Sequence, residues 1–239
     1  MSATLQSDCY VIFLETLLLG IFAIRMSKRI KNLDPMEKPK GIVLPIILLA
    51  EYIDGQVSES VGRKNADKLT PYIITITIYI FFSNTISLFG LASPTANLSV
   101  TLLLAIITWV LIQITEFKYQ GTKGYFHSFL EPIPVMLPMN IIGKFSLLIS
   151  LSVRLFGNII CGGIMMELIY NFCQFLSNGI AGWCGAQGGV FNFMAPILAP
   201  LLHAYFDLFA GFVQTLVFVS LTVVLIGNDV PEEIKKGIN

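Results

Sequence analysis

Five apolar runs in this chain are long enough to cross a lipid bilayer as helices, and they restrict the possible folds more than any other feature. The hydrocarbon core is about 30 Å thick, which roughly 20 helical residues span. The runs cover residues 10–24, 72–91, 100–115, 141–172 and 190–226. Only 13% of the residues are charged and 55% are hydrophobic, whereas soluble domains carry about 25% charged residues. We therefore expect an all-α, polytopic membrane protein with a single membrane domain over residues 1–239.

Two of these runs exceed one straight crossing. At about 1.5 Å per residue, helices over 141–172 and 190–226 would each measure about 50 Å, so we expect them to be long and tilted. Residues 41–68 begin apolar and continue polar, which predicts an amphipathic segment at the membrane interface. The first run is expected to stay as a helix rather than be removed as a signal peptide, because the residues before it carry Asp8 and no positive charge.

The positive charges predict the orientation. Lys and Arg gather between the first and second crossings, after the third crossing and near the C-terminus. The first nine residues and the loops near 92–99 and 174–189 contain none. This pattern predicts an outer N-terminus and a cytoplasmic C-terminus. Lys144 and Arg154 depart from it, and we expect Lys144 to extend its ammonium group to the cytoplasmic interface.

Polar and ionisable residues inside the two long runs are the candidate functional residues, because such groups are costly in lipid. A row at spacing four lies in the run 141–172: Ser146, Ser150, Arg154, Asn158 and Gly162. A second row lies in the run 190–226: His203, Asp207, Gly211 and Gln214. Residues three or four apart share a helix face. One helix thus presents a single cation and the other a titratable row, which indicates a path for a small cation interrupted by a fixed positive charge.

Other interpretations of these residues stay open at this point. Arg154 could form a structural ion pair with Asp207 or Glu167, His203 could be a packed core residue, and Glu131 could cap a loop. A solute transporter with Arg154 as an anion site would predict internal repeats, and no convincing repeat is visible. A membrane scaffold is a further alternative.

Soluble catalytic chemistry has no visible site in the sequence. There is no CxxC pair, no His/Cys cluster and no phosphate-binding glycine loop, so we expect no metal and no cofactor. The net charge is +0 and no region is a basic tract, so nothing indicates a nucleic-acid partner, and we expect none. Cys173 and Cys184 bracket a predicted outer loop and would form a disulfide only in an oxidising setting.

Five motifs in order carry a resemblance to a known family. They are "FFSNTISLFGL" (81–91), "PTANLSVT" (94–101), "KGYFHSFLEPIPVMLPMNII" (123–142), "SLSVRLFGN" (150–158) and "QTLVFVSLT" (214–222). The chain resembles subunit a of the membrane sector of F-type ATP synthases, and the SxRLFGN string is highly specific for that family.

The resemblance implies a stator subunit of a rotary ATP synthase in a bacterial plasma membrane, without ATPase chemistry of its own. Its partners would be the ring of c subunits, the peripheral-stalk b subunits and the soluble catalytic head. In the family, two offset half-channels lead ions to and from the ring carboxylates, and an essential arginine, here Arg154, separates them. We expect protons as the coupling ion. Sodium stays open, because ion choice depends mainly on the ring.

The resemblance also assigns candidate residues one by one. Asn158 and Gln214 match family residues near the arginine, Ser150 lies on its helix, and Asp207 matches an outer half-channel position. Gly163 departs from the family, which often has Glu there.

Glu167, one turn later, is expected to replace that acid in an outer inlet with Asp207 and His203. Asn97 stands where an outer Asp is common. On the cytoplasmic side, Gly143 and Lys144 replace family glutamates, which leaves Glu131 or residues near Asp54 as candidates for the inner exit.

Overall fold

The computed structural model describes residues 2–31, 41, 43–91, 93–130, 134–183, 192, 194–231 and 235. Its regular elements in these ranges are all helical. Five helices are long and apolar enough to cross a membrane: Tyr10–Lys31, Arg63–Leu88, Leu98–Thr122, Leu137–Ile180 and Ala195–Asn228. The prediction of an all-α, polytopic membrane protein is therefore confirmed.

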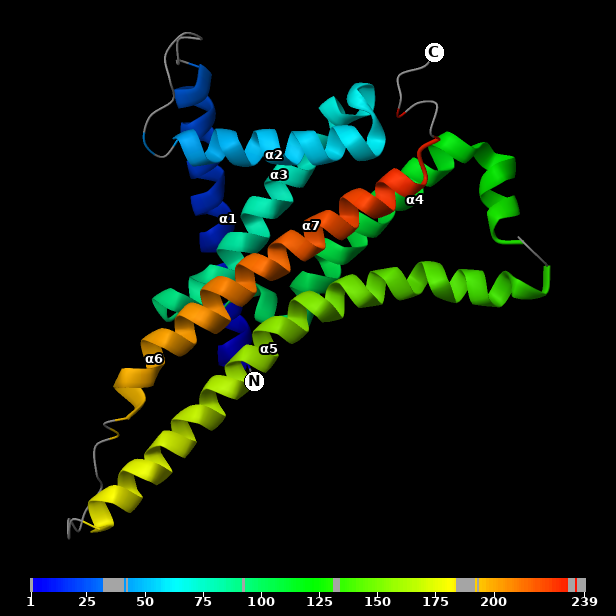
Figure 1. Cartoon of the computed structure of the whole chain (residues 1–239). Helices are drawn as coiled ribbons and strands as arrows, with labels where there is room; N and C mark the ends of the chain where they lie inside the picture. Colours follow the sequence, from blue (N-terminus) through cyan, green and yellow to red (C-terminus); the bar gives the residue numbers. More distant parts are fainter. Residues whose placement is uncertain are drawn as a thin grey trace.

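Figure 1 shows the arrangement of these helices. The main elements are α1 (Ser2–Lys31), α2 (Val43–Val61), α3 (Arg63–Thr85), α4 (Leu98–Ser128), α5 (Leu137–Trp183), α6 (Ala195–His203) and α7 (Gly211–Asn228). A π-helical segment, Ala204–Ala210, joins α6 to α7. Three short 3-10 segments complete the described part: Ile86–Phe89, Pro94–Ala96 and Pro134–Met136. The long helix α5 and the pair α6–α7 run side by side, oblique to α1 (Figure 1).

The segment expected at the interface, 41–68, divides into two helices. Gly62 has φ 83°, a conformation that favours glycine, and α3 begins directly after it. At this corner Arg63 Nη1 lies 2.5 Å from Asp54 Oδ2, and Thr70 Oγ1 donates to Asp54 Oδ1 at 3.0 Å. The helix α2 lies across the end of the bundle (Figure 1), while residues 63–68 belong to the helix that continues as a crossing.

The two long runs differ in regularity. In the described chain, α5 continues without a break to Trp183, well past residue 172. The run 190–226 is not one regular α-helix, because Pro200 lies inside α6 and the π-helical segment follows it. Such π-helical turns occur frequently at functional sites. The helix α4 bends at Gly121, which has φ 69° and ψ 173°.

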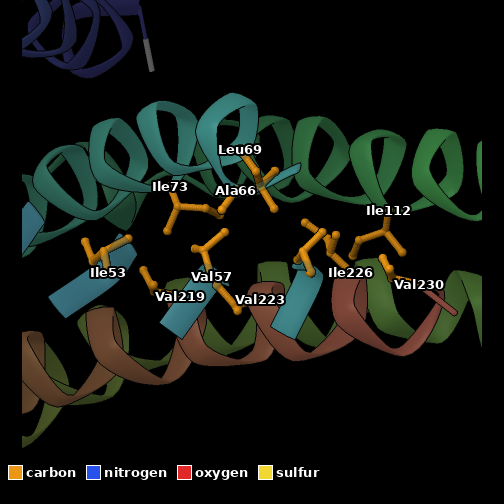
Figure 2. Packing of buried hydrophobic residues seen from close by; sticks show 11 residues of the cluster. Ile53, Val57, Ala66, Leu69, Ile73, Ile112, Val219, Val223, Ile226 and Val230 are labelled. Atoms are coloured by element: carbon orange, nitrogen blue, oxygen red, sulfur yellow. The ribbon is translucent and has the colours of Figure 1, made fainter. Parts of the chain in front are cut away.

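A buried hydrophobic cluster joins α2, α3 and α7 (Figure 2). Val57 and Ile73 are fully buried in it, and Val219, Val223 and Ile226 face them from α7. A second cluster connects α3, α4, α5 and α7 through Ile76, Ile80, Ala105, Leu151, Leu155 and Phe218. In lipid, helices associate by close packing rather than by the hydrophobic effect. These clusters therefore set the position of α5 and α7 relative to the rest of the bundle.

Gly227 allows α7 to approach α2 closely. A Cβ atom at this position would lie 2.9 Å from the carbonyl oxygen of Ser60. We predict that Gly227→Ala destabilises the subunit by about 1–3 kcal/mol, since the clash is with backbone. Thermal unfolding of the subunit in the detergent-solubilised complex measures this effect.

Gly55→Ala on α2 is the matched control, because nothing lies within 4 Å of a Cβ there. Alanine favours a helix over glycine by about 1 kcal/mol, so this variant should melt at the wild-type temperature or above. Equal melting temperatures for the two variants would contradict the proposed close contact.

Candidate ion-path residues

Arg154 lies at the edge of the face by which α5 packs on the bundle. Leu151, Ser152 and Leu155 are buried, and Ser152 Oγ lies 3.4 Å from Thr101 Oγ1 of α4. Val153, on the other side, is 52% exposed. Arg154 itself is half-buried.

Within the described part of the chain, Arg154 makes no ion pair and no hydrogen bond. The structural ion pair with Asp207 or Glu167 is thus not formed. A guanidinium group left unpaired beside apolar surface is unfavourable in lipid. Its charge remains available to an anionic group of another molecule.

Two buried amide groups lie on the same pair of helices. Asn158 Nδ2, one turn after Arg154 on α5, and Gln214 Nε2 on α7 are buried and have no hydrogen-bond partner in the described chain. A buried donor without a partner costs about 1–3 kcal/mol. Ser150, one turn before Arg154, is exposed. Each of the two polar rows predicted from the sequence therefore contains one amide group with unused hydrogen-bonding capacity.

His203 and Asp207, which begin the polar row predicted in the run 190–226, form a hydrogen-bonded pair. His203 Nδ1 lies 2.6 Å from Asp207 Oδ2, and His203 Nε2 lies 3.0 Å from the hydroxyl of Tyr170 on α5. The histidine side chain is 40% exposed and the aspartate side chain 17% exposed. Three groups able to exchange protons are therefore connected across two helices.

Tyr170 was missed by the sequence analysis, although it follows Glu167 at helical spacing of three. Glu167 is exposed on α5 and forms no ion pair or hydrogen bond with described residues. The structure therefore connects His203 to Tyr170 rather than to Glu167.

The remaining candidates have separate positions. Asn97 caps α4, since its Oδ1 accepts a hydrogen bond from the Ser99 amide at 2.9 Å. Glu131 and Cys184 lie outside the described residues, so the inner-exit role of the first and the disulfide of the second are not described. Cys173 is buried on α5.

Lys144, which we expected to extend to the cytoplasmic interface, forms an ion pair with Glu116. Its Nζ lies 2.5 Å from Glu116 Oε1 on α4, and its side chain is only 19% exposed. The ammonium group also lies over the rings of Tyr125 and Phe129, at 4.5 and 4.1 Å from their centroids. These contacts with the rings depend on the bend of α4 at Gly121, because the chain after the bend carries both aromatic residues back toward Lys144.

Asp229 belongs to the same end of the bundle, directly after α7. Burial, and to a lesser extent the negative charge of Glu116, raise the pKa of its carboxyl group to about 6, although the positive charge of Lys144 opposes this rise. Glu116, Lys144 and Asp229 come from three distant parts of the sequence. They form an inner cluster, named for the predicted cytoplasmic side, at the end of α7 opposite to His203 and Asp207.

Comparison with known proteins identifies the family. The model of the ATP synthase A chain family matches residues 9–227. The chain belongs to this family. ATP synthase subunit a of Mycoplasmoides gallisepticum is 33% identical over 88% of this chain and 73% of its own length. The subunit of Oceanobacillus iheyensis is 28% identical over 95% of this chain and 91% of its own. The sodium ion specific subunit a of Propionigenium modestum is 30% identical over 82% of this chain and 65% of its own.

Membership in this family settles the general role. The chain is a multi-pass bacterial membrane protein and the ion-channel subunit of an F-type ATP synthase, not a catalytic subunit. The candidate residues above are therefore considered as parts of an ion path.

The raised pKa of Asp229 predicts a pH-dependent stability. The folded state keeps this proton up to about pH 6, whereas the unfolded carboxyl group loses it near its ordinary value of 3.8. The unfolded state therefore binds fewer protons in this interval, and stability falls as the pH rises from about 4 to 6. We predict that Asp229→Asn removes this fall.

Thermal unfolding of the solubilised complex between these pH values measures the difference. Asp67→Asn, at an exposed position of α3, is the control and should keep the wild-type slope. An unchanged slope in Asp229→Asn would show that the carboxyl group ionises normally.

Proposed function

We propose that this chain provides two offset half-channels for protons and that Arg154 separates them while facing the carboxylates of a rotating ring of c subunits. The observation that carries this proposal is the unpaired, half-buried guanidinium group of Arg154, between titratable clusters at opposite ends of the bundle. Along α5 it lies about 15 Å from Lys144 and about 24 Å from Tyr170, at about 1.5 Å per residue. Neither cluster extends to the arginine.

The outer inlet contains His203, Asp207 and Tyr170, with Glu167 at the exposed edge. Imidazole, carboxyl and phenol groups at 2.6 and 3.0 Å support proton exchange. A ring carboxylate would receive its proton here and travel through lipid as the neutral acid. The unpaired amides of Asn158 and Gln214 lie between this inlet and the packed centre and can bind the carboxylate or water during the transfer.

Arg154 acts through its charge. A nearby cation favours the ionised form of a carboxyl group, so a ring carboxyl group that reaches Arg154 releases its proton. The same charge repels protons that would pass directly between the half-channels. Arginine suits this position because a guanidinium group stays protonated, whereas a buried lysine can lose its proton.

The inner exit is assigned to Glu116, Lys144 and Asp229. Asp54, one of the candidates from the sequence, is paired with Arg63 and Thr70 at the α2–α3 corner. Asp229, with a pKa of about 6, can bind and release a proton near neutral pH. The orientation that follows from the positive charges places this cluster at the cytoplasmic side and the N-terminus outside.

The partners of the proposal are the c-subunit ring, the peripheral-stalk b subunits and the soluble catalytic head. One similar subunit is named sodium ion specific, so the experiment below also distinguishes protons from sodium ions as the coupling ion. Protons are proposed here because the paired groups on α5 and α6 are proton donors and acceptors.

Replacement of Arg154 tests the central claim. In inverted vesicles carrying the whole complex, Arg154→Ala should abolish ATP-driven acidification, read with a pH-sensitive dye beside a sodium-uptake assay. Arg25→Ala, at an exposed position near the end of α1, is the matched control and should pump normally. Wild-type pumping by Arg154→Ala would make the arginine structural and refute the mechanism. Sodium uptake without acidification in the unaltered complex would refute the choice of protons.

A second experiment tests the inner exit. Asp229→Asn removes a titratable group without changing the size of the side chain, so we expect proton pumping to fall about tenfold or more. Asp67→Asn should pump at the wild-type rate. Normal pumping by Asp229→Asn would leave the inner exit to other residues.

A further inference from the structure

A buried carboxyl group lies in α1, where the sequence analysis placed no functional residue. Glu15 is 3% exposed, in the middle of an apolar helix whose other faces are largely exposed. Ser83 Oγ of α3 donates a hydrogen bond to Glu15 Oε1 at 2.7 Å. Glu15 Oε2 is buried and has no partner within the described chain.

The contact with Ser83 belongs to a larger buried polar network. Ser93 Oγ donates to the carbonyl oxygen of Ser83 at 2.5 Å and lies 2.7 Å from Thr95 Oγ1. Thr95 Oγ1 donates to Asn84 Oδ1 at 3.0 Å. Ser83, Asn84 and Thr95 are fully buried.

This network ends on α7 beside the proposed outer inlet. Asn84 Nδ2 lies 3.4 Å from the carbonyl oxygen of Gly211, and a Cβ at Gly211 would lie 3.1 Å from Asn84 Cβ. Gly211 follows Asp207 by one helical turn and precedes Gln214 by three residues. The network thus connects Glu15 to the same end of the bundle as His203 and Asp207.

A purely structural role explains only part of this arrangement. Asparagine or glutamine would accept the same hydrogen bond from Ser83 without the cost of a carboxyl group. An ionised carboxylate with one unpaired oxygen is unfavourable in a buried site unless it binds a proton or another cation. Tyr79, one turn before Ser83, also hydrogen-bonds Ser83 and interacts electrostatically with Glu15. The site therefore has one titratable carboxyl group surrounded by hydroxyl groups.

We propose that Glu15 is a proton-binding residue of the outer inlet, upstream of Asp207. A proton binds Oε2 and gives the neutral acid while Ser83 continues to donate to Oε1. Its release to the next acceptor in the inlet restores the carboxylate. This proposal rests on the proposed function, since it extends the same half-channel from α7 to α1.

The experiment uses inverted vesicles carrying the whole complex. Glu15→Gln keeps the size of the side chain and an oxygen that can accept from Ser83, but it cannot bind the proton. We expect it to reduce ATP-driven acidification about tenfold or more, while the ring and head still co-purify with the subunit. Glu15→Asp should recover part of the activity, and Glu51→Gln at an exposed position of α2 should pump normally.

The outcomes separate this role from the proposed function. Normal pumping by Glu15→Gln together with an inactive Arg154→Ala would refute the role of Glu15 alone. Normal pumping by Arg154→Ala would refute the half-channel mechanism as a whole. If the glutamine variant does not assemble, Ser83→Ala decides: reduced acidification in an assembled complex supports the role, and wild-type acidification overturns it. Glu15-dependent sodium uptake without acidification would overturn the assignment to protons.

Discussion

Lipid does not solvate ionic groups, and this constraint explains most of the polar arrangement of the chain. Inside the bundle, Glu116 faces Lys144, and Asp207 faces His203. Within the described residues, these four side chains have partners from another turn or another helix. Arg154 has no such partner, and the proposed mechanism assigns its charge to the ring of c subunits.

Close packing between small residues determines where these groups lie. Gly211 approaches Asn84, and Gly227 approaches Ser60 more closely than a larger residue would allow. Both contacts involve α7, so its two ends are held against α3 and α2. The His203–Asp207 pair and Asp229 flank these ends. Small residues at helix contacts are typical of membrane proteins, and here they place titratable groups as well as helices.

The sequence predicted the fold class well, because apolar run length and charge distribution are properties of single segments. The arginine and the rows with His203, Asp207 and Gln214 were also visible, since helical spacing is local. The pairing of Glu116 with Lys144 was not visible. It depends on the bend at Gly121 and on contacts between residues far apart in the sequence. Glu15 was missed for the same reason: its buried environment comes from α3 and from the turn at residues 93–95, not from its own helix.

The proposed half-channels require that protons cannot pass through the subunit without the rotor, and the second hydrophobic cluster supplies a physical basis for this. On α3, Ile80 lies one turn before Ser83 of the outer polar network. On α4, Ala105 lies between Asn97 and Glu116. On α7, Phe218 lies between Gln214 and Asp229. On α5, Leu151 and Leu155 flank Arg154. All of these hydrophobic residues are buried in one cluster. A packed, largely apolar layer therefore lies between the outer polar network and the inner cluster at the level of Arg154. Because a proton cannot be solvated in such a layer, the proposed path must leave the subunit on one side of the arginine and return on the other. A carboxyl group that moves past Arg154 on another molecule meets this requirement.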